Sequence, residues 1–151
     1  MLTYSLEDII NIWKVDCKVD LSRLEDVSAD SSKLHAKYLE IYAQNNLDIR
    51  EKELIHDLLW HEKRLWLDGK LTPQQLLDKE WKPDPFNGIK KPMKSEIGDW
   101  LKTDSDIQKS SRELAEFNTK KEVLREILSQ IQWRHTHIKN ILDSRKFESG
   151  F

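Results

Sequence analysis

The chain has 151 residues, enough for one domain or one domain with an appendage; 38% are hydrophobic and 34% charged, a balance that suits exposed helices better than a thick globular core. The net charge of −2 divides unevenly, because residues 1–59 carry 7 Lys/Arg against 12 Asp/Glu and residues 60–151 carry 18 against 15, which allows an anionic partner for the second part. Cys17 is the single cysteine, so no internal disulfide can form, and the absence of a membrane-length apolar run or a secretion signal favours a soluble, intracellular protein in a reducing compartment.

The first part of the chain predicts three amphipathic helices. Ser5 begins a short one, with Leu6, Ile9, Ile10 and Trp13 on one face. A second follows Asp20 or Ser22, carries an apolar stripe and stops near Asn45-Asn46. A third runs from Asp48 to the Asp68-Gly69-Lys70 turn, where glycine accepts the left-handed conformation of a helix C-terminus. We expect the second and third helices to form an antiparallel hairpin.

A change in composition follows. Thr72-Pro73 starts another short helix, since threonine caps and proline suits the first helical position. Pro83, Pro85, Gly88 and Pro92 then predict a loop, and residues 93–101 are ambiguous because Gly98 weakens an otherwise helical pattern.

The longest run without proline or glycine, residues 104–146, predicts one long helix that Thr103 or Asp104 can cap. Its apolar residues recur with a heptad period and form a seam, as in helices that pack along their length. Such a helix would span roughly 60 Å at about 1.5 Å per residue, and the other predicted helices are too short to cover it. A long member of an intramolecular bundle is one interpretation; packing against copies of the same chain is the one we favour. The predicted oligomerisation residues are Leu114, Phe117, Leu124, Leu128, Ile131, Ile138 and Leu142.

Motifs for catalysis are missing from the sequence. The four glycines are not clustered into a phosphate loop, and the His and Cys residues lack the spacing of metal ligands. We therefore expect a protein that is not an enzyme and has no metal or cofactor, although a site assembled from distant residues stays open as an alternative.

The sequence supports nucleic-acid binding better than catalysis, because it contains basic residues mixed with aromatic ones. Single-stranded nucleic acid is held by cations on its phosphates and by aromatic faces against its bases. Three groups offer both, and each also suits an ordinary solvated surface: residues 60–70, the loop around Phe86, and the C-terminal turns around Trp133. Each group is weak alone, but repetition in a ring of identical subunits would raise avidity.

The C-terminal run His137–Gly150 resembles the end of the phage UvsY recombination mediators, with an IKxIxDxRxFExG pattern. Residues 94–97 and residues 19–70 are also similar in order and spacing. The resemblance implies a non-enzymatic protein in the bacterial host cytoplasm that forms a homo-oligomeric ring, a hexamer or heptamer, and binds single-stranded DNA. It also implies two protein partners, a RecA-class recombinase and a single-strand-binding protein, in recombination-dependent replication and repair, and associates the C-terminal region with oligomerisation.

The family's basic DNA-binding motif is most similar to residues 60–70, where Arg64-Leu65 and Gly69-Lys70 match and the first lysine has no clean counterpart. The segment from Thr72 to Pro92 is longer than in the family. The DNA-binding residues that we predict are His61, Lys63, Arg64, Trp66, Lys70, Lys90, Lys91 and Lys94.

The sequence thus predicts an all-α protein with a helical region at 1–81, a Pro-rich basic loop at 82–95 and a long oligomerising helix at 96–151. A recombination mediator is the function that we favour. A helical scaffold that binds only proteins is the main alternative, and a helical-bundle enzyme is a third.

Overall fold

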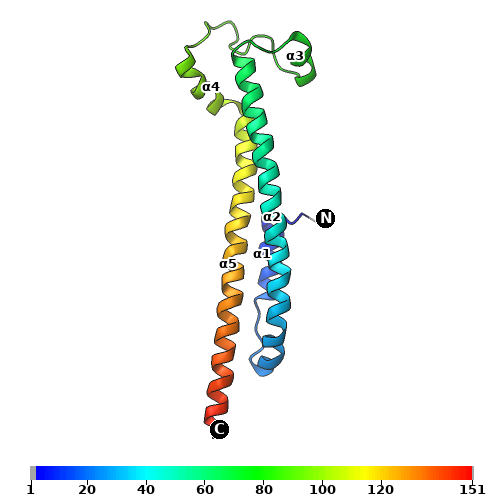
Figure 1. The fold of residues 1–151 in the computed structure, drawn as a ribbon, viewed down its shortest axis with the longest axis vertical. Coiled ribbons are helices and arrows are strands. Elements are labelled where there is room, and N and C mark those ends of the chain that lie inside the picture. Colours follow the sequence, from blue (N-terminus) through cyan, green and yellow to red (C-terminus); the bar gives the residue numbers. More distant parts are fainter. Residues whose placement is uncertain (1–2, 151) are drawn as a thin grey trace. The chain divides into compact units, whose positions relative to one another are not determined.

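Helices make up the fold in the computed structural model, which describes residues 3–150 (Figure 1). No strand occurs within this range, so the all-α prediction is confirmed. The helices are α1 (Leu6–Asp16), α2 (Leu24–Leu67), α3 (Pro73–Lys79), α4 (Ile97–Thr103) and α5 (Ser105–Glu148), with short 3-10 turns η1 (Leu21–Arg23) and η2 (Lys94–Glu96).

The helix starts follow the predicted capping chemistry. The Ser5 hydroxyl accepts a hydrogen bond from the Asp8 amide at 3.0 Å, and the Asp8 carboxylate accepts one from the Ser5 amide at 3.1 Å. Thr72 and Gln75 form the same reciprocal pair before α3, with Pro73 at its first position. Both pairs satisfy amides that have no partner inside the helix.

The structure differs from the predicted hairpin at Asn45-Asn46, because α2 continues through these residues to Leu67. Asn45 is buried, and its side-chain amide donates to the carbonyl of Phe117 on α5 at 3.1 Å. A tertiary hydrogen bond thus uses the polar group that suggested a helix stop. Asparagine costs only a fraction of a kcal/mol inside a helix, so packing overrides its propensity.

The described residues form two compact units, each with its own core. Unit 1 holds the residues up to Ile49 and those from Glu116 onward, and unit 2 is Arg50–Ala115. The core of unit 1 contains Ile9 from α1, Tyr38 from α2, and Leu124, Ile127 and Ile131 from α5. The core of unit 2 contains Leu67, Phe86, Ile97, Leu101 and Ile107. The predicted regions follow composition along the chain, whereas unit 1 combines two segments that are distant in sequence and unit 2 is one continuous stretch.

In unit 2 the contacts between α2 and α5 show an antiparallel pair. Lys52 forms an ion pair with Glu113 at 3.6 Å, His56 a hydrogen bond with Ser110 at 2.9 Å, and Lys63 an ion pair with Asp106 at 2.8 Å. The residue numbers rise along one helix as they fall along the other. The two segments that the sequence suggested as partners, residues 22–46 and 48–68, are instead consecutive parts of α2.

Several predicted oligomerisation residues are core residues of a single chain. Leu124, Ile131 and Ile138 are 0%, 2% and 2% exposed, and Leu114, Phe117, Leu128 and Leu142 are half-buried. The reason is the length of α2, which at 44 residues equals that of α5 and gives each unit a stretch of α2 to cover α5. A side chain that is buried within one copy has no surface left for another, so these three residues act in folding.

Within residues 3–150, every helix is too short or too polar to serve as a membrane span.

Replacing Leu124 with alanine tests the importance of this core. The side chain is fully buried, so the Leu124→Ala change should lower the free energy of unfolding by about 3 kcal/mol through lost burial and a cavity. Leu54→Ala, at a position that is 70% exposed, should change it by less than about 0.5 kcal/mol. Urea denaturation monitored by circular dichroism measures both. Equal losses would contradict the assignment of Leu124 to the core.

Candidate nucleic-acid interface

The predicted DNA-binding segment lies at the C-terminal end of α2. The helix ends at Leu67, and Gly69 follows with φ 71°, a left-handed conformation that glycine adopts without strain. The Lys70 amide donates to the Leu65 carbonyl at 2.9 Å and the Gly69 amide donates to the Trp66 carbonyl at 3.1 Å. These bonds end the helix in a Schellman motif. They hold the backbone of the last turn, which carries the predicted basic side chains, in a defined conformation.

Lys63, the central cation of the predicted site, is buried. It is 3% exposed, and its ammonium lies 3.1 Å from a carboxylate oxygen of Asp104 and 2.8 Å from one of Asp106. The same ammonium lies 4.7 Å from the ring centroid of Trp66 and 4.2 Å from that of Trp81. Two carboxylates and two aromatic faces therefore surround the charge and compensate for its removal from water.

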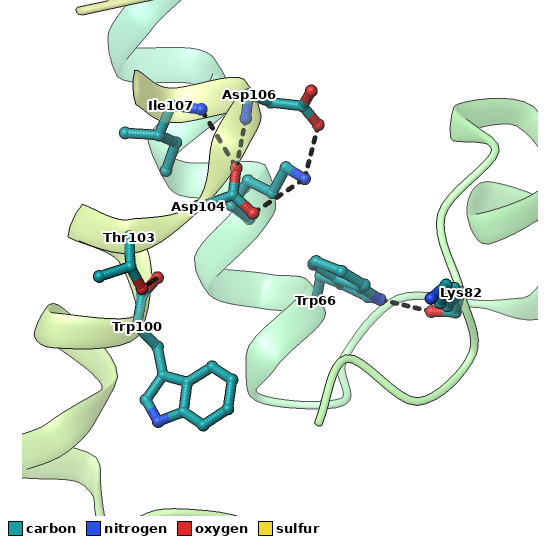
Figure 2. A network of polar contacts seen from close by, with 8 residues as sticks. Trp66, Lys82, Trp100, Thr103, Asp104, Asp106 and Ile107 are labelled. Carbon is teal, nitrogen blue, oxygen red and sulfur yellow. Dashed lines mark hydrogen bonds and ion pairs between the residues drawn. The ribbon is translucent and has the colours of Figure 1, made fainter. Parts of the chain in front are cut away.

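Asp104 has a second task at the same position. One of its carboxylate oxygens accepts from the amides of Asp106 at 3.0 Å and Ile107 at 3.1 Å, which caps the N-terminus of α5 (Figure 2). Its other oxygen pairs with Lys63. The lysine thus joins the end of α2 to the start of α5 inside unit 2, and we reassign it from phosphate contact to structural cation.

Trp66 is half-buried, and much of its surface is already used. Its indole N–H donates to the Lys82 carbonyl at 2.7 Å (Figure 2), and its ring tilts by 37° against Trp81 at a centroid distance of 5.4 Å. The predicted stacking on a DNA base would have to use the remaining exposed part of the ring. Trp60 is also half-buried and packs against the core of unit 2.

Two exposed cations remain on this turn. Arg64 and Lys70 are exposed, and neither side chain has an ion-pair or hydrogen-bond partner among residues 3–150. His61 is exposed one turn before Arg64, near the same side of α2. These three residues keep the accessibility that a phosphate contact requires.

The predicted loop presents its lysines from an ordered base. Phe86 is 6% exposed and meets Trp100 edge-to-face at a centroid distance of 5.0 Å. The Asp84 carboxylate accepts from the amides of Phe86 at 2.9 Å and Gly88 at 2.7 Å. These contacts anchor the first half of the loop, and the lysines that follow are exposed: Lys90, Lys91 and Lys94.

Sequence reasoning missed the partners of Lys63 and one more exposed cation. Asp104 and Asp106 could be recognised only as residues at a helix start, and Trp81 stood alone before the prolines. Lys82, next to Trp81, is exposed and adds to the basic surface of unit 2. No group of three or more His, Cys, Asp or Glu side chains within the described part of the chain could hold a metal ion.

Comparison with known proteins identifies a family. Residues 12–151 match the family described as "Recombination, repair and ssDNA binding protein UvsY". No match was found among curated proteins.

Solved structures with the same fold include those of the bacteriophage T4 recombination mediator protein UvsY. The lattice type II structure has a TM-score of 0.82 and 22% identity, and the alignment covers 97% of this chain and 99% of that one. The lattice type I structure gives 0.78 and 20%, covering 93% and 98%. The lattice type IV structure gives 0.75 and 20%, covering 96% and 99%. At these identities the likeness establishes the fold alone.

The burial of Lys63 predicts a loss of stability when it is replaced. Lys63→Ala would leave the Asp104 and Asp106 carboxylates without their shared cation, and should lower the free energy of unfolding by about 3 kcal/mol. Arg64→Ala, one residue away and exposed, should stay within about 0.5 kcal/mol of the parent. Urea titrations of the two variants give the comparison. A Lys63→Ala variant as stable as Arg64→Ala would refute the structural assignment.

Proposed function

This chain belongs to the UvsY family of recombination, repair and single-stranded-DNA-binding proteins, and we propose on that premise that it acts as a ring-like homo-oligomer on single-stranded DNA. In this role it helps to load a RecA-class recombinase onto DNA that a single-strand-binding protein covers. The observation that carries the proposal is the family match over residues 12–151, and the exposed cations of unit 2 supply a chemical basis for it.

The proposed DNA contacts are the exposed members of the predicted set. Arg64 and Lys70 at the end of α2 contact phosphates, and His61 extends this surface along the helix. The loop adds Lys90, Lys91 and Lys94. Trp66 contacts a base only through the part of its ring that Trp81 and Lys63 leave free. Lys63 supports this surface indirectly, because its ion pairs with Asp104 and Asp106 hold the end of α2 in place.

Self-association is proposed to use side chains that one chain leaves exposed. Trp133 and Phe147 are 71% and 80% exposed although both are large and apolar. They lie about four turns apart on one side of α5, and at about 100° per residue this side is turned about 140° to 180° away from buried Ile138. Exposed apolar surface opposite a core face is typical of a contact with another chain.

Assembly matters because each DNA contact is weak. A few phosphate contacts give low, salt-sensitive affinity. Several identical subunits that engage one strand raise the overall affinity by orders of magnitude without any new kind of contact. A strand bent along such a ring would be held in a form that disfavours the covering protein and leaves the DNA open to the recombinase.

Removing Arg64 and Lys70 tests the DNA surface. The Arg64→Ala/Lys70→Ala variant should bind a fluorescein-labelled single-stranded oligonucleotide more weakly, with a salt dependence whose log–log slope falls by about 0.7 for each phosphate that the protein no longer neutralises. Anisotropy titrations at several salt concentrations measure this. The matched control is Lys102→Ala/Lys109→Ala, which removes the same charge from exposed positions of unit 2 outside the predicted set. Indistinguishable slopes in the two variants would reject the assigned surface, and no binding by the parent would favour the scaffold alternative.

Solution mass tests the assembly. The parent should sediment as an oligomer, and Trp133→Ser/Phe147→Ser should sediment at a lower mass because the exposed apolar surface on α5 is removed. The control is Leu77→Ser/Met93→Ser, which changes two apolar side chains that are each 72% exposed in unit 2. A parent that stays a single subunit with and without oligonucleotide would overturn the assembly, whereas equal masses for the two variants would overturn only the choice of surface.

A further inference from the structure

A groove in unit 1 gathers basic side chains that are far apart in the sequence. Its volume is about 370 Å³, and its walls come from the end of α1, the first turns of α2 and the later part of α5. The cations that line it are Lys18, Lys33, Lys37 and Arg134. Val27 and Leu34 contribute an apolar stretch of the wall.

The clustering is unusual for this part of the chain. Residues 1–59 are acidic, with 7 Lys/Arg against 12 Asp/Glu. Three of those seven cations, Lys18, Lys33 and Lys37, line this one groove, and α5 adds Arg134. A local positive potential inside an acidic region selects for an anion.

The carboxylates of the groove do not cancel this charge. Asp16 accepts from the Lys37 ammonium at 2.7 Å and from the Tyr38 hydroxyl at 2.9 Å. Burial raises the pKa of Tyr38 far above its ordinary value, so the phenol remains a donor to Asp16. The other carboxylate, Asp30, is exposed. Because Lys37 pairs with Asp16, three cations remain against the single carboxylate of Asp30.

Several donors of the groove are free to bind a ligand. The terminal nitrogens of Arg134 make long contacts with the carbonyls of Asp16, at 3.3 and 3.4 Å, and Lys18, at 3.5 Å. Its Nε is buried without a hydrogen-bond partner among residues 3–150, so the guanidinium is not saturated with partners inside the protein. The ammonium groups of Lys18 and Lys33 are exposed and also have no partner within that range.

We propose that this groove is a second contact site for single-stranded DNA, in which Lys18, Lys33 and Arg134 bind a backbone phosphate. Val27 and Leu34 lie against the adjoining sugar or base. Lys37 has a supporting part, because it holds Asp16 and keeps that carboxylate from repelling the phosphate. The site rests on the proposed function, and it adds to the surface of unit 2 a contact provided by unit 1 of the same subunit.

Lysine acetylation tests the site in the full-length protein. A single-stranded oligonucleotide should protect Lys18 and Lys33 from a lysine-acetylating reagent at least about threefold, measured by mass spectrometry of peptides, while exposed Lys14 and Lys139 keep their reactivity. Equal protection of all four lysines, or of none while DNA is bound, would overturn the site. Inorganic phosphate at the same phosphate concentration is the second probe, and protection by it equal to that by DNA would make the groove a free-anion site and overturn the assignment.

Binding measurements separate this inference from the proposed function. Lys18→Ala/Lys33→Ala should reduce the log–log salt slope of oligonucleotide binding by about 1.4, two contacts at about 0.7 each, whereas Lys14→Ala/Lys139→Ala should leave it unchanged. If both variants bind like the parent, the groove is rejected and DNA binding stands. If the parent itself binds no single-stranded DNA, the proposed function fails and the groove's ligand fails with it.

Discussion

Burial of the apolar side chains that recur along α5 is the constraint on which the rest of this structure depends. A helix with a heptad seam must cover that seam with another helix, from its own chain or from another copy. Here the same chain covers the seam, because α2 and α5 are each 44 residues long and α2 contributes to both compact units. Leu124, Ile131 and Ile138 are consequently core residues. The self-association that we propose therefore uses side chains that this pairing leaves exposed.

Burial also distinguishes the charged side chains at the end of α2. A lysine amid basic and aromatic neighbours is a reasonable phosphate ligand by sequence, but Lys63 faces the start of α5 and meets Asp104 and Asp106 there. Removing this buried cation costs far more than removing an exposed charge, since the largely buried Asp104 carboxylate loses its partner inside the protein. Arg64, the next residue, points to solvent. Adjacent residues of one helix thus differ in burial, and only Arg64 keeps the accessibility that the proposed phosphate contact requires.

The DNA contacts that we propose are distributed over several elements of the chain. The cations of unit 2 come from the end of α2 and from the Pro-rich loop, and the groove of unit 1 draws on α1, α2 and α5. No single group is strongly basic, in keeping with a net charge of −2. In the proposed oligomer, many weak contacts, each repeated once per subunit, would make DNA binding sensitive to salt and easy to reverse. Reversible binding suits the proposed role, in which the strand passes to a recombinase.

The sequence by itself determined the helical class, the start of each capped helix, the long α5 and the family, because these depend on local chemistry. Capping residues, the glycine turn after Leu67 and heptad spacing act over a few residues and are visible in one dimension. Tertiary structure alone decided that α2 runs on through Asn45, because the buried amide finds the Phe117 carbonyl on another helix. It also decided the burial of Lys63 and the meeting of Lys18, Lys33 and Arg134 in one groove. These outcomes depend on which helices pack together, and no local pattern encodes the partner that a side chain will meet.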